Sequence, residues 1–175
     1  MNLYLMRHCE PVPGHPNNAE RPLTEAGLKQ AADMGKWLAG HIGRVDIIIA
    51  SPFTRAMQTA QAMSKALGAH VADTRMLVPD GTPEAAWKEI ERLAQQSKDV
   101  LVVGHDPSLN TLIGWLQGFG EDFSPKELRL EWGSIACMTT KKTEGTLQWL
   151  VSPLIVLAEK EIVEAARGFV GILNA

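Results

Sequence analysis

The chain reads VDIIIASPFTR at residues 45–55 and VLVVGHDP at residues 100–107. Each segment is a short apolar run, followed by turn residues and by a positively charged or titratable side chain. Runs that are apolar on both faces are typical of buried parallel strands. Helix-like stretches separate these runs, and strands that alternate with helices predict a parallel sheet covered by helices.

The chain before the first of these segments predicts a strand, a loop and a helix. Residues 2–6 form a short apolar run, and residues 9–22 are broken by several prolines. Thr24 is a good cap for the helix that follows. The apolar positions at helical spacing, which we expect to face inward, are Leu28, Ala31, Ala32, Gly35, Leu38, Ala39 and Ile42.

Proline and polar residues mark the starts of the later helices. Ser51 and Asp106 each precede a proline, and we expect both to cap helices. A third helix should open at Thr82. The second helix should bury Ala56, Thr59, Ala60, Met63 and Leu67.

The rest of the chain predicts a weaker strand, a hairpin and a last helix. The weaker strand spans residues 71–77, and the hairpin joins residues 134–140 and 147–152 around Thr143-Glu144-Gly145. Residues 118–125 are expected to form a loop. The last helix, over residues 155–173, should turn Ile162, Ala166, Phe169 and Leu173 inward.

Together these elements predict an α/β fold with three layers, α/β/α, around a mostly parallel mixed sheet. We expect one domain over residues 1–154 and an amphipathic helix over residues 155–175 that packs on or beside it. The length of 175 residues suits one domain, and 45% apolar and 21% charged residues are ordinary globular values.

Composition also argues against several functions. The net charge of −3 and the lack of a long basic run argue against nucleic-acid binding. No run is apolar and long enough for a membrane span, and the first residues do not resemble a signal peptide, so we expect a cytoplasmic protein. The 2 cysteines, Cys9 and Cys137, form no CxxC pair, so a zinc site is not suggested.

Cationic and titratable side chains follow three of the clearest strands. Arg7 and His8 follow the first, Arg55 lies just beyond the second, and His105 follows the VLVV run. The carboxyl ends of parallel strands meet at one edge of a sheet, where ligands bind. A cation in the first turn of a helix opposes the helix dipole, which an anionic ligand would relieve. The alternative for Arg55 alone is a solvated surface arginine, and for each histidine a structural role.

The motifs themselves resemble a known family. LMRH at residues 5–8, RPLTEAG at residues 21–27, SPFTRAMQTA at residues 51–60 and GHDP at residues 104–107 are similar to the motifs of the histidine phosphatase superfamily, which has the phosphoglycerate-mutase-like fold. SIA at residues 134–136 and WLVSP at residues 149–153 resemble, more narrowly, the bacterial SixA-type phosphohistidine phosphatases. The resemblance covers residues 1–154.

The resemblance implies a mechanism. His8 would attack phosphorus and become a phosphohistidine intermediate. Arg7, Arg55 and His105 would bind the oxygens of the transferred phosphoryl group, and Arg21 would add a further phosphate contact. Water would then release phosphate, with no metal or cofactor.

The sequence departs from the family pattern at two points. Cys9 stands where the family usually has glycine. We weigh two roles for it: packing behind the nucleophile, or a thiol activated by nearby cations and open to oxidation. The second cysteine, Cys137, should be buried and inert. No convincing general acid is found, the nearest candidates being Asp80 and Glu84, and the SixA-type branch generally lacks that acid.

Three functions follow from these observations. The first is a phosphatase that acts on phosphohistidine of a partner protein, such as a histidine-carrier protein. The second is a phosphomonoesterase for a small sugar or nucleotide phosphate. The third is an inactive phosphate-binding module. The short spacing between the second and third motifs leaves no room for a capping domain, which favours the first.

Overall fold

A single mixed sheet organises the molecule. The structure, a computed structural model, describes residues 1–119 and 129–161. Within these residues the strand order is β3-β2-β4-β1-β5-β6. The first four strands run parallel, and β5 and β6 are added antiparallel beside β1. The strands are β1 (Asn2–Arg7), β2 (Ile47–Ala50), β3 (Val71–Asp73), β4 (Asp99–Gly104), β5 (Ile135–Lys141) and β6 (Glu144–Val151).

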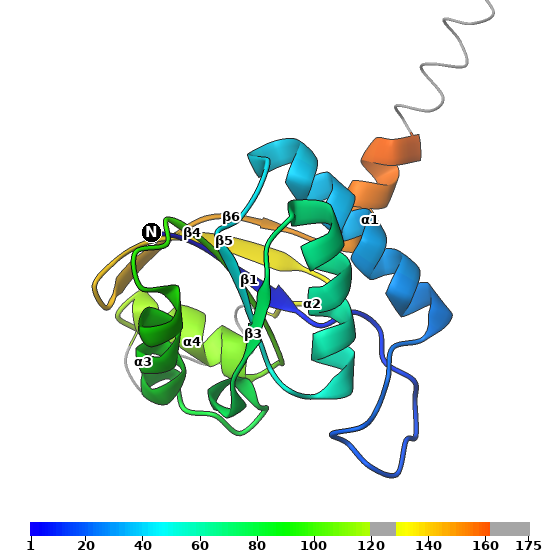
Figure 1. Ribbon diagram of the computed structural model, residues 1–175, viewed down its shortest axis with the longest axis horizontal. Coiled ribbons are helices and arrows are strands. Elements are labelled where there is room, and N and C mark those ends of the chain that lie inside the picture. Colours follow the sequence, from blue (N-terminus) through cyan, green and yellow to red (C-terminus); the bar gives the residue numbers. More distant parts are fainter. Residues whose placement is uncertain (120–128, 162–175) are drawn as a thin grey trace, which may run out of the picture.

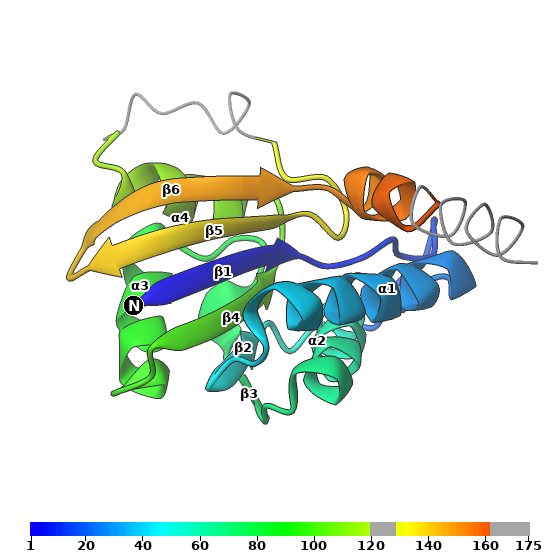
Figure 2. The ribbon, with the colours of Figure 1, turned by 90° about the horizontal axis from the view of Figure 1, so that it is seen from above.

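Helices cover both faces of this sheet (Figure 1, Figure 2). One apolar cluster joins α1 (Glu25–Ile42) and α2 (Thr54–Leu67) to the sheet. A second cluster joins α3 (Pro83–Ala94) and α4 (Ser108–Leu116) to the opposite face. The expected three-layer fold with a mostly parallel mixed sheet is therefore confirmed. None of the helices among the described residues is long and apolar enough to cross a membrane.

The inward face of α1 differs from the expected one. Thr24 caps this helix as predicted, by accepting a hydrogen bond from the backbone N–H of Gly27. Gly27 and Met34 are buried, whereas Leu28 is 44% exposed and Ala32 is exposed. Ala31, Gly35 and Leu38 are buried as predicted. The apolar spacing thus identified the centre of the buried face, whereas packing against α2 and the 9–22 loop sets its edges.

The second and fourth helices begin later than predicted. The second helix, α2, begins three residues after Ser51, and α4 begins two residues after Asp106. Phe53 and Pro107 occupy the cap positions and make no side-chain cap bond. Ser51 and Asp106 are therefore not helix caps. The third helix does open at Thr82 as expected, because the Thr82 hydroxyl accepts a bond from Ala85. The inward face predicted for α2 is confirmed, since all five of its residues are buried.

The segments after β2 and after β5 also depart in detail from the prediction. The strand expected over residues 71–77 is only three residues long and continues as a 3₁₀ turn, η1 (Arg75–Leu77). The hairpin turn falls at residues 142–143, one residue earlier than predicted. Lys142 takes the positive φ, 54°, that a tight turn requires.

The C-terminal helix begins at residue 153, two residues before the predicted start. Val156 is buried in the cluster that α1 and α2 share, so the helical segment 153–161 packs against the domain. The four residues expected to face inward from 162 onward lie outside the described residues, as does most of the loop predicted at 118–125. The division at residue 154 stays a prediction.

Gly27 provides a test of how the 9–22 loop is held on α1. A Cβ at position 27 would collide with the backbone carbonyl of Glu10, whereas a Cβ at Gly40 in the same helix would meet open space. We expect Gly27→Ala to lower the free energy of unfolding by about 1–3 kcal/mol, a typical cost of overpacking. Gly40→Ala, the matched control, should raise it by about 0.5–1 kcal/mol. Urea denaturation measures both, and equal effects would show that the contact does not constrain the helix.

Candidate active site

The site lies beyond the carboxyl ends of three adjacent strands, β2, β4 and β1. His8, Ser51 and His105 each follow one of these strands directly. The backbone N–H of His8 donates to Gly104 at 2.9 Å, and that of Ser51 donates to Val103 at 2.9 Å. The sheet ladder therefore continues into the site and fixes the backbone of its residues.

The ring of His8 is held in one tautomer. Its Nδ1 lies 2.7 Å from the carbonyl oxygen of Cys9, which can only accept, so Nδ1 carries the proton. The other nitrogen, Nε2, then has a free lone pair and accepts a hydrogen bond from Nε of Arg55 at 3.1 Å. The lone pair of Nε2 is the nucleophile that this geometry offers.

Arg55 also binds the second histidine. Its Nη2 donates to Nδ1 of His105 at 3.2 Å, so Nε2 of His105 carries the proton and donates to the Ser51 hydroxyl at 2.9 Å. The two imidazole rings lie 5.1 Å apart between centroids. One guanidinium thus bridges two neutral histidines.

The environment of Arg55 excludes the simple surface-arginine interpretation. The residue is only 2% exposed, and Nη1 donates to the backbone carbonyl of Asn18 at 2.6 Å. The charges that act on it within the described residues are those of Arg21 and Arg7, both positive. Burial and these two cations lower its pKa to about 10.

Two further arginines border the same space. Nη1 of Arg7 donates to the Leu130 carbonyl at 2.8 Å and lies 3.4 Å from a carboxylate oxygen of Asp106. The β-bridge between Pro11 and Leu23 brings the neighbouring Arg21 back toward the site. Among the described residues, Nε of Arg7 and Nε of Arg21 are buried donors without a hydrogen-bond partner. Such donors suit an anionic ligand.

These surroundings keep both histidines neutral. Burial is the main cause, and the charges of Arg55, Arg7 and Arg21 add to it. The pKa of His8 falls from 6.5 to about 3. The pKa of His105 falls to about 2. A neutral imidazole at physiological pH keeps its lone pair for attack on phosphorus.

Cys9 does not behave as an activated thiol. It is fully buried in the cluster beneath the site, and burial raises the pKa of its thiol to about 12. The redox hypothesis is therefore wrong, because the thiol is out of reach of solvent and burial favours its neutral form. Cys9 packs behind His8, and its backbone N–H donates to Thr59 at 3.1 Å. Cys137 is buried, as expected.

The two carboxyl groups considered as general acids lie elsewhere. Asp80 and Glu84 are exposed, in the turn before α3 and in its first turn. Neither is among the charged groups that act on His8 or His105. Within residues 1–119 and 129–161, no group of three or more histidine, cysteine or acidic side chains is arranged to hold a metal ion.

Sequence reasoning missed the residues that orient this cluster. Ser51 accepts a hydrogen bond from Nε2 of His105, and Asp106 faces Arg7 and accepts a bond from Asn110 at 2.6 Å. Thr59 joins the backbone of Cys9 to that of Arg55. The only sequence signal for Ser51 and Asp106 was their position next to the strand ends. From the sequence alone, we interpret that position as helix capping.

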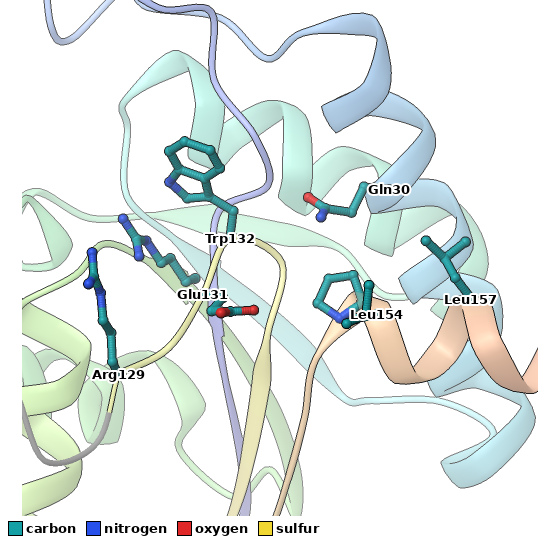
Figure 3. Close-up of a pocket in the computed structure, with 8 residues that line it drawn as sticks. Gln30, Arg129, Glu131, Trp132, Leu154 and Leu157 are labelled. Carbon is teal, nitrogen blue, oxygen red and sulfur yellow. The ribbon is translucent and has the colours of Figure 1, made fainter.

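A groove opens beside Arg7. It has a volume of about 510 Å³. Figure 3 shows Trp132 and Arg129 on one side of it and Leu154 and Leu157, from the C-terminal helix, on the other. No sequence motif pointed to this groove.

Comparison with known proteins agrees with this geometry. The model of the histidine phosphatase superfamily (branch 1) matches residues 3–78. A phosphohistidine phosphatase SixA homolog of Haemophilus influenzae is 30% identical over 128 residues, which are 67% of this chain and 78% of that protein. SixA of Escherichia coli is 26% identical over 170 residues, 93% of this chain and 100% of that protein.

The fold comparison gives the same result. The solved structure of the protein histidine phosphatase SixA complexed with tungstate matches with a TM-score of 0.79 and 26% identity, covering 89% of this chain and 99% of that one. The chain belongs to the histidine phosphatase superfamily, and within it to the SixA-type branch. It is accordingly a hydrolase that acts on phosphate groups.

The depressed pKa values of the two histidines predict acid sensitivity. The unfolded chain binds protons near pH 6.5, whereas folded His8 and His105 stay neutral until about pH 3 and 2. Their contribution to stability is therefore complete above pH 6.5 and is lost as the pH falls below it. Each histidine should add up to about 1.4 kcal/mol per pH unit to the slope of the free energy of unfolding against pH.

Urea denaturation between pH 7 and 4 measures this slope. His105→Asn should flatten it, whereas Ser51→Ala, which removes the hydrogen bond but keeps the titrating group, should leave it unchanged. An unchanged slope in His105→Asn would mean that the ring does not resist protonation in the folded protein.

Proposed function

We propose that this protein is a phosphohistidine phosphatase that removes the phosphoryl group from a histidine on a partner protein, by way of a phosphorylated His8. The observation that carries the proposal is the lone pair of His8 Nε2, directed at a buried guanidinium within a cluster of three arginines. The names of the relatives supply the substrate class. These relatives are bacterial, and we extend a bacterial origin and a cytoplasmic location to this chain.

Binding begins at the unpaired donors. Nε of Arg7 and Nε of Arg21 have no partner among the described residues, whereas the donors of Arg55 are engaged with the histidines and with Asn18. An incoming phosphoryl group therefore meets Arg7 and Arg21 first. Its negative charge then attracts the Arg55 guanidinium, which leaves Nε2 of His8 free to attack.

The chemical step transfers the phosphoryl group between two imidazoles. The lone pair of His8 Nε2 forms a bond to phosphorus while the bond from phosphorus to the substrate nitrogen breaks. The Cys9 carbonyl, bonded to Nδ1–H, stabilises the positive charge that develops on the ring. Arg7, Arg21 and Arg55 hold the phosphoryl oxygens, which is electrostatic stabilisation by preorganised groups. His105 joins them by taking up a proton on Nδ1, which the negative charge of the phosphoryl group favours.

The leaving nitrogen needs little help. The nitrogen of a phosphohistidine is readily protonated as it leaves, so a strong protein acid is less necessary than for an alcohol leaving group. This agrees with the distant positions of Asp80 and Glu84. Water then attacks the phosphorus on His8, phosphate leaves, and the free imidazole returns. A small phosphomonoester is the second candidate substrate, which the volume of the groove beside Arg7 can admit.

The role of His8 is tested by substitution and trapping. His8→Ala should abolish turnover, and brief incubation of the wild type with phosphoramidate should leave an acid-labile, base-stable phosphate on His8. His70→Ala, at an exposed histidine elsewhere, is the control and should keep full activity. Wild-type activity in His8→Ala, or the label on another residue, would end this assignment.

Arg55 should act as an electrostatic clamp. Arg55→Met keeps an unbranched side chain but removes the cation, and should lower kcat/KM about 10²-fold or more, as loss of one preorganised donor does. We also expect phosphate to raise the Tm of the wild type and not that of Arg55→Met, because the anion then has one cation fewer to bind. Arg75→Met, at an exposed arginine of η1, is the matched control. A full phosphate-induced rise in Arg55→Met would contradict the clamp.

The substrate class is tested by a panel. A phosphohistidine carrier protein, phosphoramidate and several sugar phosphates are compared by kcat/KM. We expect the phosphohistidine protein to be hydrolysed best. A clear preference for a sugar phosphate would replace the proposal by its alternative.

A further inference from the structure

The groove beside Arg7 extends the catalytic centre outward. Arg7 belongs to both, because its side chain borders the histidine cluster and also lines the groove. The groove therefore adjoins the place where a phosphoryl group would reach His8.

Both walls of the groove present exposed apolar surface. On one side the Trp132 ring is 43% exposed, and the guanidinium of Arg7 lies 5.8 Å from its centre. On the other side Leu154 is 76% exposed and Leu157 is 39% exposed. Leaving such side chains in water is unfavourable, and their grouping is typical of an interaction surface.

The Trp132 wall is fixed relative to the nucleophile. Gly133 donates its N–H to the carbonyls of Arg7 at 3.1 Å and of His8 at 3.2 Å. Its φ of 78° and the close approach of Pro153 and Gln30 leave no room for a side chain at this position. The loop that carries Trp132 is therefore attached directly to the catalytic strand end.

The leucine wall is fixed on α1. Val156 is buried in the core, and Nε1 of Trp37 donates to the Glu159 carboxylate at 2.9 Å. Lys160 lies 3.8 Å from Asp33. The helical segment 153–161 thus holds Leu154 and Leu157 in a set position (Figure 3).

We propose that this groove, between Trp132 and Leu154, binds an aliphatic side chain next to the phosphohistidine on the surface of a partner protein. The inference rests on the proposed function and adds the feature of the partner that is recognised. Continuity through Arg7 places the groove beside the transferred phosphoryl group. Arg129 and Arg7 outnumber the single carboxylate of Glu131 along it, so acidic residues near the aliphatic one would add attraction.

A pair of peptides tests this recognition. The two have equal length and one histidine, phosphorylated with phosphoramidate, flanked on both sides by leucine in one and by serine in the other. Burial of one leucine side chain predicts a kcat/KM at least about tenfold higher for the leucine peptide, expressed through KM.

Variants assign the preference to the groove. Leu154→Asp should reduce the ratio of kcat/KM between the two peptides to below about threefold, because a carboxylate replaces the apolar contact. The matched control is Leu28→Asp, since Leu28 is also an exposed leucine, 44% exposed, and lies in a different groove between α1 and α2. The control should keep the wild-type ratio.

The outcomes separate the two proposals. Equal kcat/KM for both peptides, or an unchanged ratio in Leu154→Asp, overturns the groove as the recognition site while phosphohistidine hydrolysis still stands. Hydrolysis of sugar phosphates but of neither peptide overturns the proposed function itself. A lowered ratio in both Leu154→Asp and Leu28→Asp would show a general effect of charge and would also overturn the groove.

Discussion

The guanidinium of Arg55 binds Nε2 of His8 and Nδ1 of His105 while it is almost completely withdrawn from water. A buried cation without a carboxylate partner is costly, so the surrounding chain must hold it there. The sheet provides this support, because β1 and β4 end side by side and the 9–22 loop supplies the Asn18 carbonyl. The helix that carries Arg55 packs its apolar face into the core, which offsets the cost.

The same crowding of cations prepares the site for reaction. Because the three arginines and burial disfavour protonation, both imidazoles remain neutral far below their usual titration range. A phosphoryl group reverses this balance, since its charge compensates the arginines. The free site therefore carries an electrostatic conflict that an anion relieves, and His8, the proposed nucleophile, already has its lone pair on Nε2.

The sequence was sufficient to predict which residues meet but not how each side chain is held. Parallel strands must end at one edge, so Arg7, His8, Arg55 and His105 could be brought together from periodicity and topology alone. Whether Ser51 caps a helix or binds a histidine depends on a half-turn of backbone, which local propensity does not resolve. The burial of Cys9 and the exposure of Leu28 likewise depend on packing between distant segments. The groove lies between the loop before β5 and the helical segment that follows β6. These segments are distant in sequence, and no local sequence pattern predicts their contact.

Charge alone gives this site little selectivity among phosphorylated compounds. In the proposed mechanism the cluster of arginines and histidines recognises the phosphoryl group, which all candidate substrates share. Discrimination must therefore come from surface next to the cluster, where the substrate beyond its phosphoryl group makes contact. In the described structure that surface is formed by Trp132 and the leucines of the helical segment 153–161. The loop of Trp132 is hydrogen-bonded to the backbone of Arg7 and His8, and the helical segment is bonded to α1. A recognition surface fixed in this way can be tuned by substitutions that leave the buried charges undisturbed.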